Sequence, residues 1–152
     1  MNDIKRELEL ATIPEMPERK DYRIGIIGAG FIVQGCHLVA YQKAGFTPYA
    51  ITSKSGVRAK EAAEAFQIPN VYDTWQALID DPRVEILDIA VPPHVQPEIV
   101  RYACGKMHIK GILCQKPIAM STADAEEIAR LGEEAGIPIA VNSNMRYDQS
   151  MR

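Results

Sequence analysis

Apolar and polar positions form two kinds of pattern along this chain. Short, nearly continuous apolar runs are typical of strands covered on both faces of a parallel sheet, whereas apolar positions three and four residues apart are typical of helices. Strands are predicted around residues 22–28, 47–52, near 71, 84–91, 109–114 and 137–141. Helices are predicted between them, at residues 31–43, 59–66, 75–79, 97–105 and 121–136.

The ends of these elements carry matching signals. Gly45 and Gly136 stand where a helix C-cap is expected, because glycine adopts the left-handed conformation without steric cost. Asp73 or Thr74 is expected to cap the short helix that begins with Trp75, and Trp75 is predicted to belong to the core.

Strands that alternate with helices predict parallel pairing through right-handed crossovers. The predicted fold class is therefore α/β, with a doubly wound parallel sheet of about six strands and helices on both faces. Residues 84–91 are expected to form a central strand. At 152 residues the chain fits one domain, predicted at residues 21–152, after an N-terminal extension at residues 1–20.

The composition narrows the class of partner. With 47% hydrophobic residues, 24% charged residues and a net charge of -3, the chain has no broad basic field for nucleic acid. It has no apolar run near 18 residues and no apolar N-terminal stretch of the signal-peptide kind, so we expect a cytoplasmic protein that does not enter a membrane.

The cysteines and histidines lack the spacing of a metal site or a disulfide framework. We expect the cysteines to be buried small apolar residues and the histidines to be structural, and we predict no metal. The residues concerned are Cys36, Cys104, Cys114, His37, His94 and His108.

A glycine-rich turn follows the first predicted strand. Gly28 can take backbone angles forbidden to a side chain, Gly30 lets the main chain approach a pyrophosphate, and the next helix presents free N–H groups to anionic oxygens. The third position of the dinucleotide fingerprint holds Val33, which weakens the match without removing the anion site, since the third glycine serves packing. Taken alone, the motif fits an ordinary strand–turn–helix unit about equally well.

Ligands of open parallel sheets bind beyond the carboxyl ends of the strands. The segment between Pro48 and Lys60 holds no acidic residue that would bind the ribose 2′-hydroxyl of NAD. Ser53, Lys54 and Arg58 supply hydroxyl and positive groups instead, which favours NADP over NAD. A solvated turn at a helix start is the alternative interpretation.

Two further strand ends carry candidate chemistry. Pro92 and Pro93 offer a flat apolar surface for a nicotinamide ring, although a plain strand terminator has the same residues. Lys116, held by Pro117, is predicted to point its ammonium into the ligand crevice, where it can hold a substrate hydroxyl or take part in proton transfer. A surface lysine at the start of a loop is the alternative, and the sequence leaves open whether the Lys116–Pro117 bond is cis.

Four segments in unbroken order resemble the N-terminal domain of the Gfo/Idh/MocA oxidoreductases, and the resemblance covers residues 22–152. The segments are Gly28–Gly30, Ile89–Pro93, Gly111–Ala119 and Val141–Tyr147. The resemblance implies a nicotinamide-dependent dehydrogenase or reductase that transfers hydride to or from a sugar, polyol or related hydroxy compound.

The resemblance also assigns roles to single residues. Lys116 matches the family lysine near nicotinamide and substrate, and is the predicted catalytic residue. Gln115 replaces the acidic residue before it, and Gln96 stands where many members have histidine. The cofactor-binding residues expected from motif and resemblance together are Gly28, Gly30, Phe31, Ile32, Ser53, Lys54, Arg58, Val91, Pro92, Pro93, Gln96, Gln115, Lys116, Asn144 and Arg146.

Family members continue into a second domain that supplies substrate contacts and the main oligomer interface. We therefore expect the 152-residue chain to bind cofactor but to be inactive alone, and the full-length form to be a homo-oligomer. A non-catalytic nucleotide-binding or assembly module is the second hypothesis. A methyltransferase ranks third, because it would normally need an acidic residue after the second strand.

Overall fold

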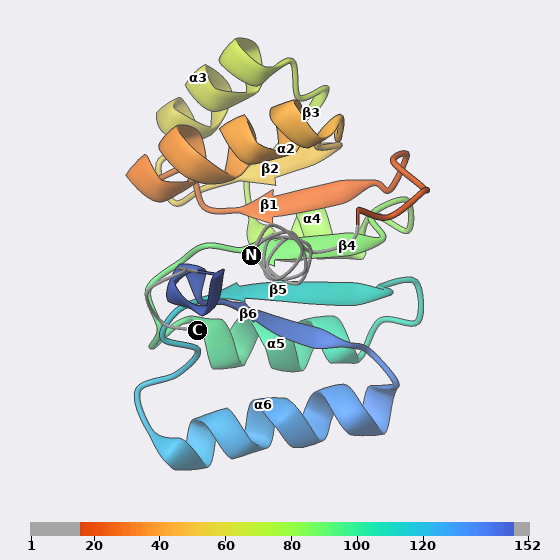
Figure 1. Cartoon of the computed structure of the whole chain (residues 1–152), viewed down its shortest axis with the longest axis vertical. Coiled ribbons are helices and arrows are strands. Elements are labelled where there is room, and N and C mark those ends of the chain that lie inside the picture. Colours follow the sequence, from red (N-terminus) through yellow and green to blue (C-terminus); the bar gives the residue numbers. More distant parts are fainter. Residues whose placement is uncertain (1–15, 148–152) are drawn as a thin grey trace, which may run out of the picture.

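A computed structural model describes residues 16–147 and contains a six-stranded sheet in which every pairing is parallel (Figure 1). The strand order is β3-β2-β1-β4-β5-β6, which confirms the predicted doubly wound sheet and the central position of β4. Residues 1–15 of the predicted extension lie outside the described part. The strands are β1 (Ile24–Ile27), β2 (Ala50–Thr52), β3 (Asn70–Tyr72), β4 (Ile86–Ile89), β5 (Gly111–Gln115) and β6 (Ile139–Asn142).

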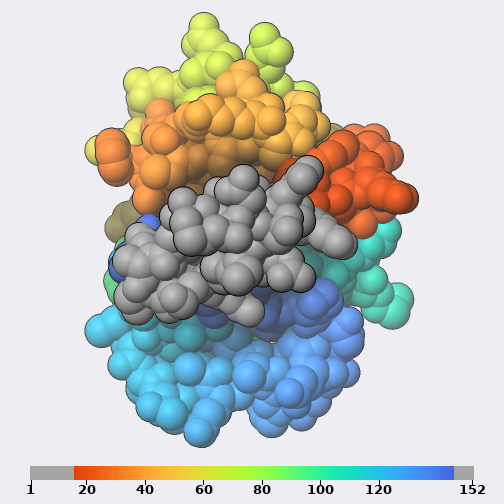
Figure 2. All heavy atoms as spheres, viewed as in Figure 1, coloured from red at the N-terminus to blue at the C-terminus, as the bar shows by residue number. Residues whose placement is uncertain are grey.

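Helices cover both faces of this sheet, as predicted, and α3 and α6 lie at the two ends of the long axis (Figure 1, Figure 2). Two separate apolar clusters show the division. One joins β1 and β2 to η1, α2 and α3, and the other joins the central strands to α4, α5 and α6. The helices are η1 (Val33–His37), α2 (Leu38–Ala44), α3 (Gly56–Phe66), α4 (Trp75–Asp80), α5 (Gln96–Cys104), α6 (Thr122–Ala135) and η2 (Asn144–Tyr147). None of the helices in this described part is long and apolar enough to cross a membrane.

The predicted helix caps are confirmed. Gly45 and Gly136 both adopt the left-handed conformation after α2 and α6. Of the two candidates for α4, Thr74 is the cap, since its side chain accepts a hydrogen bond from the backbone N–H of Ala77. Asp73 remains exposed beside it, at the end of β3. These capping residues therefore determine where α2 and α6 end and where α4 begins.

Two expectations about the core need correction. Trp75 is only half-buried, because it lies at the rim of the core and not inside it. There its ring packs edge-on against Tyr102, with ring centroids 5.3 Å apart. Cys114 is buried and Cys104 is half-buried, but Cys36 is exposed. Cys36 lies on a side of η1 that faces a cleft rather than the sheet, so its expected burial was wrong.

One carboxylate ties three segments together at the amino ends of the strands. Glu85 accepts hydrogen bonds from Lys110 and Arg19 and from the backbone N–H of Arg23. The bond from Lys110 is the main reason that the pKa of Glu85 is lowered from 4.5 to about 2. The stabilisation from this carboxylate is therefore present above pH 4.5 and is lost as the pH falls toward 2.

Glu85→Gln should lower the free energy of unfolding at pH 7 by about 1 kcal/mol, because the partners Lys110 and Arg19 are well exposed. The difference between wild type and variant should disappear between pH 4.5 and 2. Urea unfolding at several pH values measures this, with Glu134→Gln as the matched control. Glu134 forms an exposed i,i+4 pair with Arg130, so its loss should cost less than about 0.5 kcal/mol. A Glu85→Gln deficit that stays constant down to pH 2 would contradict the assignment.

Candidate functional site

The turn after β1 has a backbone conformation that only glycine accepts readily. Gly28 has a φ of 122°, and a Cβ there would collide with the carbonyl oxygen of Ala90. The Gly28 N–H donates to Thr52 O at 2.8 Å, so the turn is bonded to the end of β2 while it touches the chain just after β4. The backbone requirement predicted for Gly28 is confirmed.

Gly30 differs from Gly28 because the space above it is open. Apart from Gly30 itself and its two chain neighbours, no atom of residues 16–147 lies within 4 Å of a Cβ built on Gly30. The first helical hydrogen bonds run from the N–H groups of Val33 and Gln34 to Gly30 O, so the preceding N–H groups lie at the open helix end. Phe31 beside them is 87% exposed. A ligand can thus reach the main chain here, and the positive end of the helix dipole favours an anionic group.

A groove runs from this turn over the ends of β2 and β4. It combines two adjoining hollows of about 400 and 600 Å³, which share Gly28, Ser53, Lys54, Val91 and Pro92. Gly30 and Arg58 line the smaller hollow. The groove therefore brings together seven of the predicted cofactor-binding residues: Gly28, Gly30, Ser53, Lys54, Arg58, Val91 and Pro92.

Several residues of the larger hollow were not among the predicted site residues. Asp73, Trp75 and His94 line it together with Lys54. Asp73 matters most, because it places a carboxylate in the same hollow as Lys54. The available signal was strand order. In a doubly wound sheet the carboxyl end of β3 lies beside that of β2, so both ends contribute to one site.

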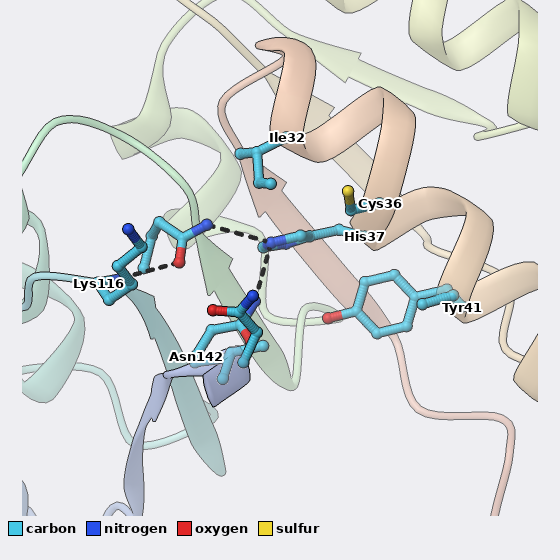
Figure 3. A pocket seen from close by; sticks show the side chains of 10 residues that line it. Ile32, Cys36, His37, Tyr41, Lys116 and Asn142 are labelled. Carbon is cyan, nitrogen blue, oxygen red and sulfur yellow. Dashed lines mark hydrogen bonds between the residues drawn. The ribbon is translucent and has the colours of Figure 1, made fainter. Parts of the chain in front are cut away.

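A second cleft, of about 530 Å³, lies on the other side of the turn, between η1, α2 and the ends of β5 and β6 (Figure 3). It brings together four predicted site residues: Ile32, Gln115, Lys116 and Asn144. Arg146 belongs to η2 beside Asn144, but its side chain lies outside the described part of the structure. Phe31 and Pro93 are outside the linings of the groove and of this cleft.

The backbone around Lys116 is held from beneath. The N–H of Lys116 donates to Gln115 Oε1 at 2.8 Å, and the Lys116–Pro117 bond is cis. Gln96 is fully buried, and its Nε2 donates to the carbonyl oxygens of Gln115 and Pro117, both at 2.9 Å. Gln96 therefore positions the main chain on both sides of Lys116, while its own side chain stays away from the cleft surface.

The floor of the cleft contains a buried histidine–aspartate hydrogen bond that sequence reasoning did not assign to the site. His37 Nδ1 lies 2.8 Å from Asp88 Oδ2, and the Tyr41 hydroxyl donates to the same oxygen at 2.9 Å. The bond to Asp88 raises the pKa of His37, although burial opposes it, and burial raises the pKa of Tyr41. An aspartate inside the apolar run 84–91 was the available signal, since a buried charge needs a partner.

His37 reaches this position because its helix is irregular. Residues 31–43 were predicted as one ordinary helix, but Val33–His37 form a π turn that continues into α2. Both Val33 and His37 are buried against the sheet. A π turn of this kind inserts an extra residue into the helix and is frequent at functional sites.

Comparison with known proteins agrees with this geometry. Residues 22–143 match the Gfo/Idh/MocA sequence profile, which describes the oxidoreductase family's NAD-binding Rossmann fold. The chain belongs to this family. D-apiose dehydrogenase from Paraburkholderia graminis is 28% identical over 134 residues, which are 88% of this chain and 35% of that protein.

Two solved structures show the same fold with a dinucleotide bound. An oxidoreductase from Agrobacterium radiobacter in complex with NAD+, L-tartaric acid and magnesium is 30% identical, with a TM-score of 0.76, over 83% of this chain and 36% of that one. The Y186F mutant of the 3-ketoreductase KijD10 from Actinomadura kijaniata, in complex with TDP-benzene and NADP, is 26% identical, with a TM-score of 0.72, over 80% and 37%. This Gfo/Idh/MocA chain thus spans about a third of the length of such relatives.

Gly28→Ala and Gly30→Ala should separate the two roles of the turn. Gly28→Ala should lower the free energy of unfolding by at least about 2 kcal/mol, because the side chain meets Ala90 O in a strained conformation. Gly30→Ala should change it by less than about 1 kcal/mol, since the added methyl enters open space. Denaturant unfolding of both variants tests this, and equal destabilisation would contradict the described turn.

Proposed function

We propose that this chain binds a nicotinamide dinucleotide in an extended form across the carboxyl ends of the strands. The supporting observation is that the groove and the cleft adjoin opposite sides of one glycine turn. Gly28 and Gly30 line the groove, whereas Ile32, two residues later, lines the cleft. The pyrophosphate would lie at the turn, the adenosine part in the groove and the nicotinamide toward Lys116.

The groove favours NADP, with one opposing feature. Lys54 and Arg58 are exposed at its rim and supply two cations for a 2′-phosphate. Hydrogen bonds to charged groups are worth about 1.5 to 3 kcal/mol each, so even one gives a preference of roughly tenfold or more. Asp73, which lines the larger hollow together with Lys54, would repel that phosphate and suits a ribose hydroxyl. Solved relatives contain NAD+ in one case and NADP in another.

The bound cofactor would accept or donate hydride, and the residues of this chain would orient the reacting groups. Lys116 is exposed at the mouth of the cleft, where its ammonium can hold a substrate oxygen or exchange a proton with it. Asn144 adds an amide on the same wall. A sugar, polyol or related hydroxy compound fits these donors, and the D-apiose dehydrogenase relative supports that class.

Gln115 supports a second candidate, a nucleotide-binding or assembly module without catalysis. Its uncharged amide stands next to Lys116, where the family pattern has a carboxylate, and its oxygen is bonded to the Lys116 N–H. We rank the hydride-transfer proposal first because Lys116 and Asn144 line the same cleft.

Calorimetric titration of the 152-residue chain with NADPH and NADH tests the binding proposal. Wild type should bind at least one of them, and Gly30→Ala should weaken that binding by about tenfold or more, because its methyl group blocks the approach of a pyrophosphate. Circular dichroism should show that the variant remains folded. Unchanged affinity in folded Gly30→Ala would exclude the pyrophosphate from this turn.

The double substitution Lys54→Ala with Arg58→Ala tests the preference for NADP. It should weaken NADPH binding about tenfold or more and leave NADH binding nearly unchanged, because only NADPH carries the 2′-phosphate. Lys60→Ala with Lys43→Ala is the matched control, since it removes the same charge from exposed helix positions outside the groove lining. Equal losses for NADPH and NADH in the double variant would remove these residues from phosphate binding.

A further inference from the structure

Five side chains form a connected polar cluster at the floor of the cleft, which we call the His37 cluster. It contains His37, Tyr41, Asp88, Gln115 and Asn142. Figure 3 shows the two hydrogen bonds that join His37 to Gln115 and Asn142. The members come from η1, α2 and the three neighbouring strands β4, β5 and β6. Asp88 is fully buried and His37 is 7% exposed. The cluster therefore links the first helix to the strand ends that carry Lys116 and Asn144.

The hydrogen positions in this cluster follow from one backbone donor. Lys116 N–H can only donate, so the oxygen end of the Gln115 amide must face it. The NH₂ end of Gln115 then faces His37 Nε2, at 3.5 Å. Asn142 Nδ2 lies 2.9 Å from the same ring nitrogen. In this arrangement the single lone pair of Nε2 accepts from Asn142, with the Gln115 NH₂ group farther away, so the ring proton is on Nδ1, which donates it to Asp88.

A proton on Nε2 would change these contacts unequally. Asn142 can turn its amide over and present oxygen to the new N–H. Gln115 cannot do so without withdrawing its oxygen from Lys116 N–H, because one amide has a single oxygen. Protonation of His37 at Nε2 therefore disfavours the orientation in which the Gln115 NH₂ group faces the ring. It thereby also disfavours the hydrogen bond from Lys116 N–H to Gln115 Oε1.

We propose that His37 is a positioning residue for the cleft, and that its unprotonated Nε2 keeps Gln115 in the orientation that holds the Lys116 backbone beside the ligand. The relevance to a ligand rests on the proposed function, in which the nicotinamide end of the cofactor lies in this cleft. In this proposal His37 acts on the ligand through the Gln115 amide.

The carboxylate of Asp88 raises the pH at which His37 titrates. Among the described residues, the ionisable groups around it are Asp88 from β4, Tyr41 from α2, Cys36 from η1 and Lys116 after β5. Cys114 of β5 packs in the apolar cluster on the opposite face of the sheet. The hydrogen bond that His37 Nδ1–H donates to Asp88 raises the pKa of His37 above 6.5, so the ring gains its second proton above that pH.

Nuclear magnetic resonance on the 152-residue chain tests the proposal without any cofactor. The side-chain amide signals of Gln115 and Asn142, identified by their loss in Gln115→Leu and Asn142→Leu, should shift with the same pH midpoint as the His37 imidazole. In His37→Gln this pH dependence should vanish. His108→Gln is the matched control and should retain it, because His108 bonds to Ile79 O away from the cleft. A Gln115 signal that does not follow His37 in wild type overturns the proposal.

Asp88→Asn provides a second variant should His37→Gln fail to fold. Removing the carboxylate should lower the common midpoint of His37 and Gln115 by about one pH unit or more. A midpoint of Gln115 that stays in place while that of His37 moves overturns the coupling.

The link to the ligand is measured by NADPH and NADH affinity across the His37 midpoint. Wild-type affinity should fall by threefold or more below the midpoint, whereas that of folded His37→Gln should vary less with pH. Flat wild-type affinity overturns the role of His37 at the ligand. If neither dinucleotide binds at any pH, the proposed function fails, and the amide titration still decides the coupling within the cluster.

Discussion

The contact between the first turn and the two flanking strands is the constraint on which the rest of the site depends. Gly28 lies against Ala90 O and bonds to Thr52 O, so three strand ends meet at a point where no side chain fits. The turn therefore packs directly against the carboxyl ends of β2 and β4. The helix that follows begins at this edge of the sheet, with the N–H groups of its first residues unbonded within the helix. The groove and the cleft are the two spaces on either side of this glycine turn.

Much of the fold was predictable because its determinants are local. Each apolar run is long enough for one buried strand, and residues such as Gly45, Thr74 and Gly136 end or begin helices through their own backbone or side-chain chemistry. Strand order then follows from alternation and crossover handedness. The residues of the groove were likewise accessible, because they directly follow strands whose ends meet at one edge of the sheet.

The remainder depends on contacts between distant segments. Burial of Gln96 beneath the Lys116 segment is set by how α5 meets β5, and nothing in its neighbouring residues indicates it. The residues of η1 likewise give no sign of its π turn. Because the π turn was not predicted, the pairing of His37 with Asp88 could not be predicted either. Asp73 was overlooked because only the end of β2 was considered and not its neighbour in the sheet.

The two edge strands share a feature with consequences for assembly. β3 and β6 are only three and four residues long, and each begins directly after a proline, Pro69 or Pro138. Short edges next to residues without an N–H offer few groups for pairing with a foreign strand. The sheet is thus protected against growth by strand addition, and contacts made through helix faces or strand ends are the favoured way for this domain to meet another polypeptide.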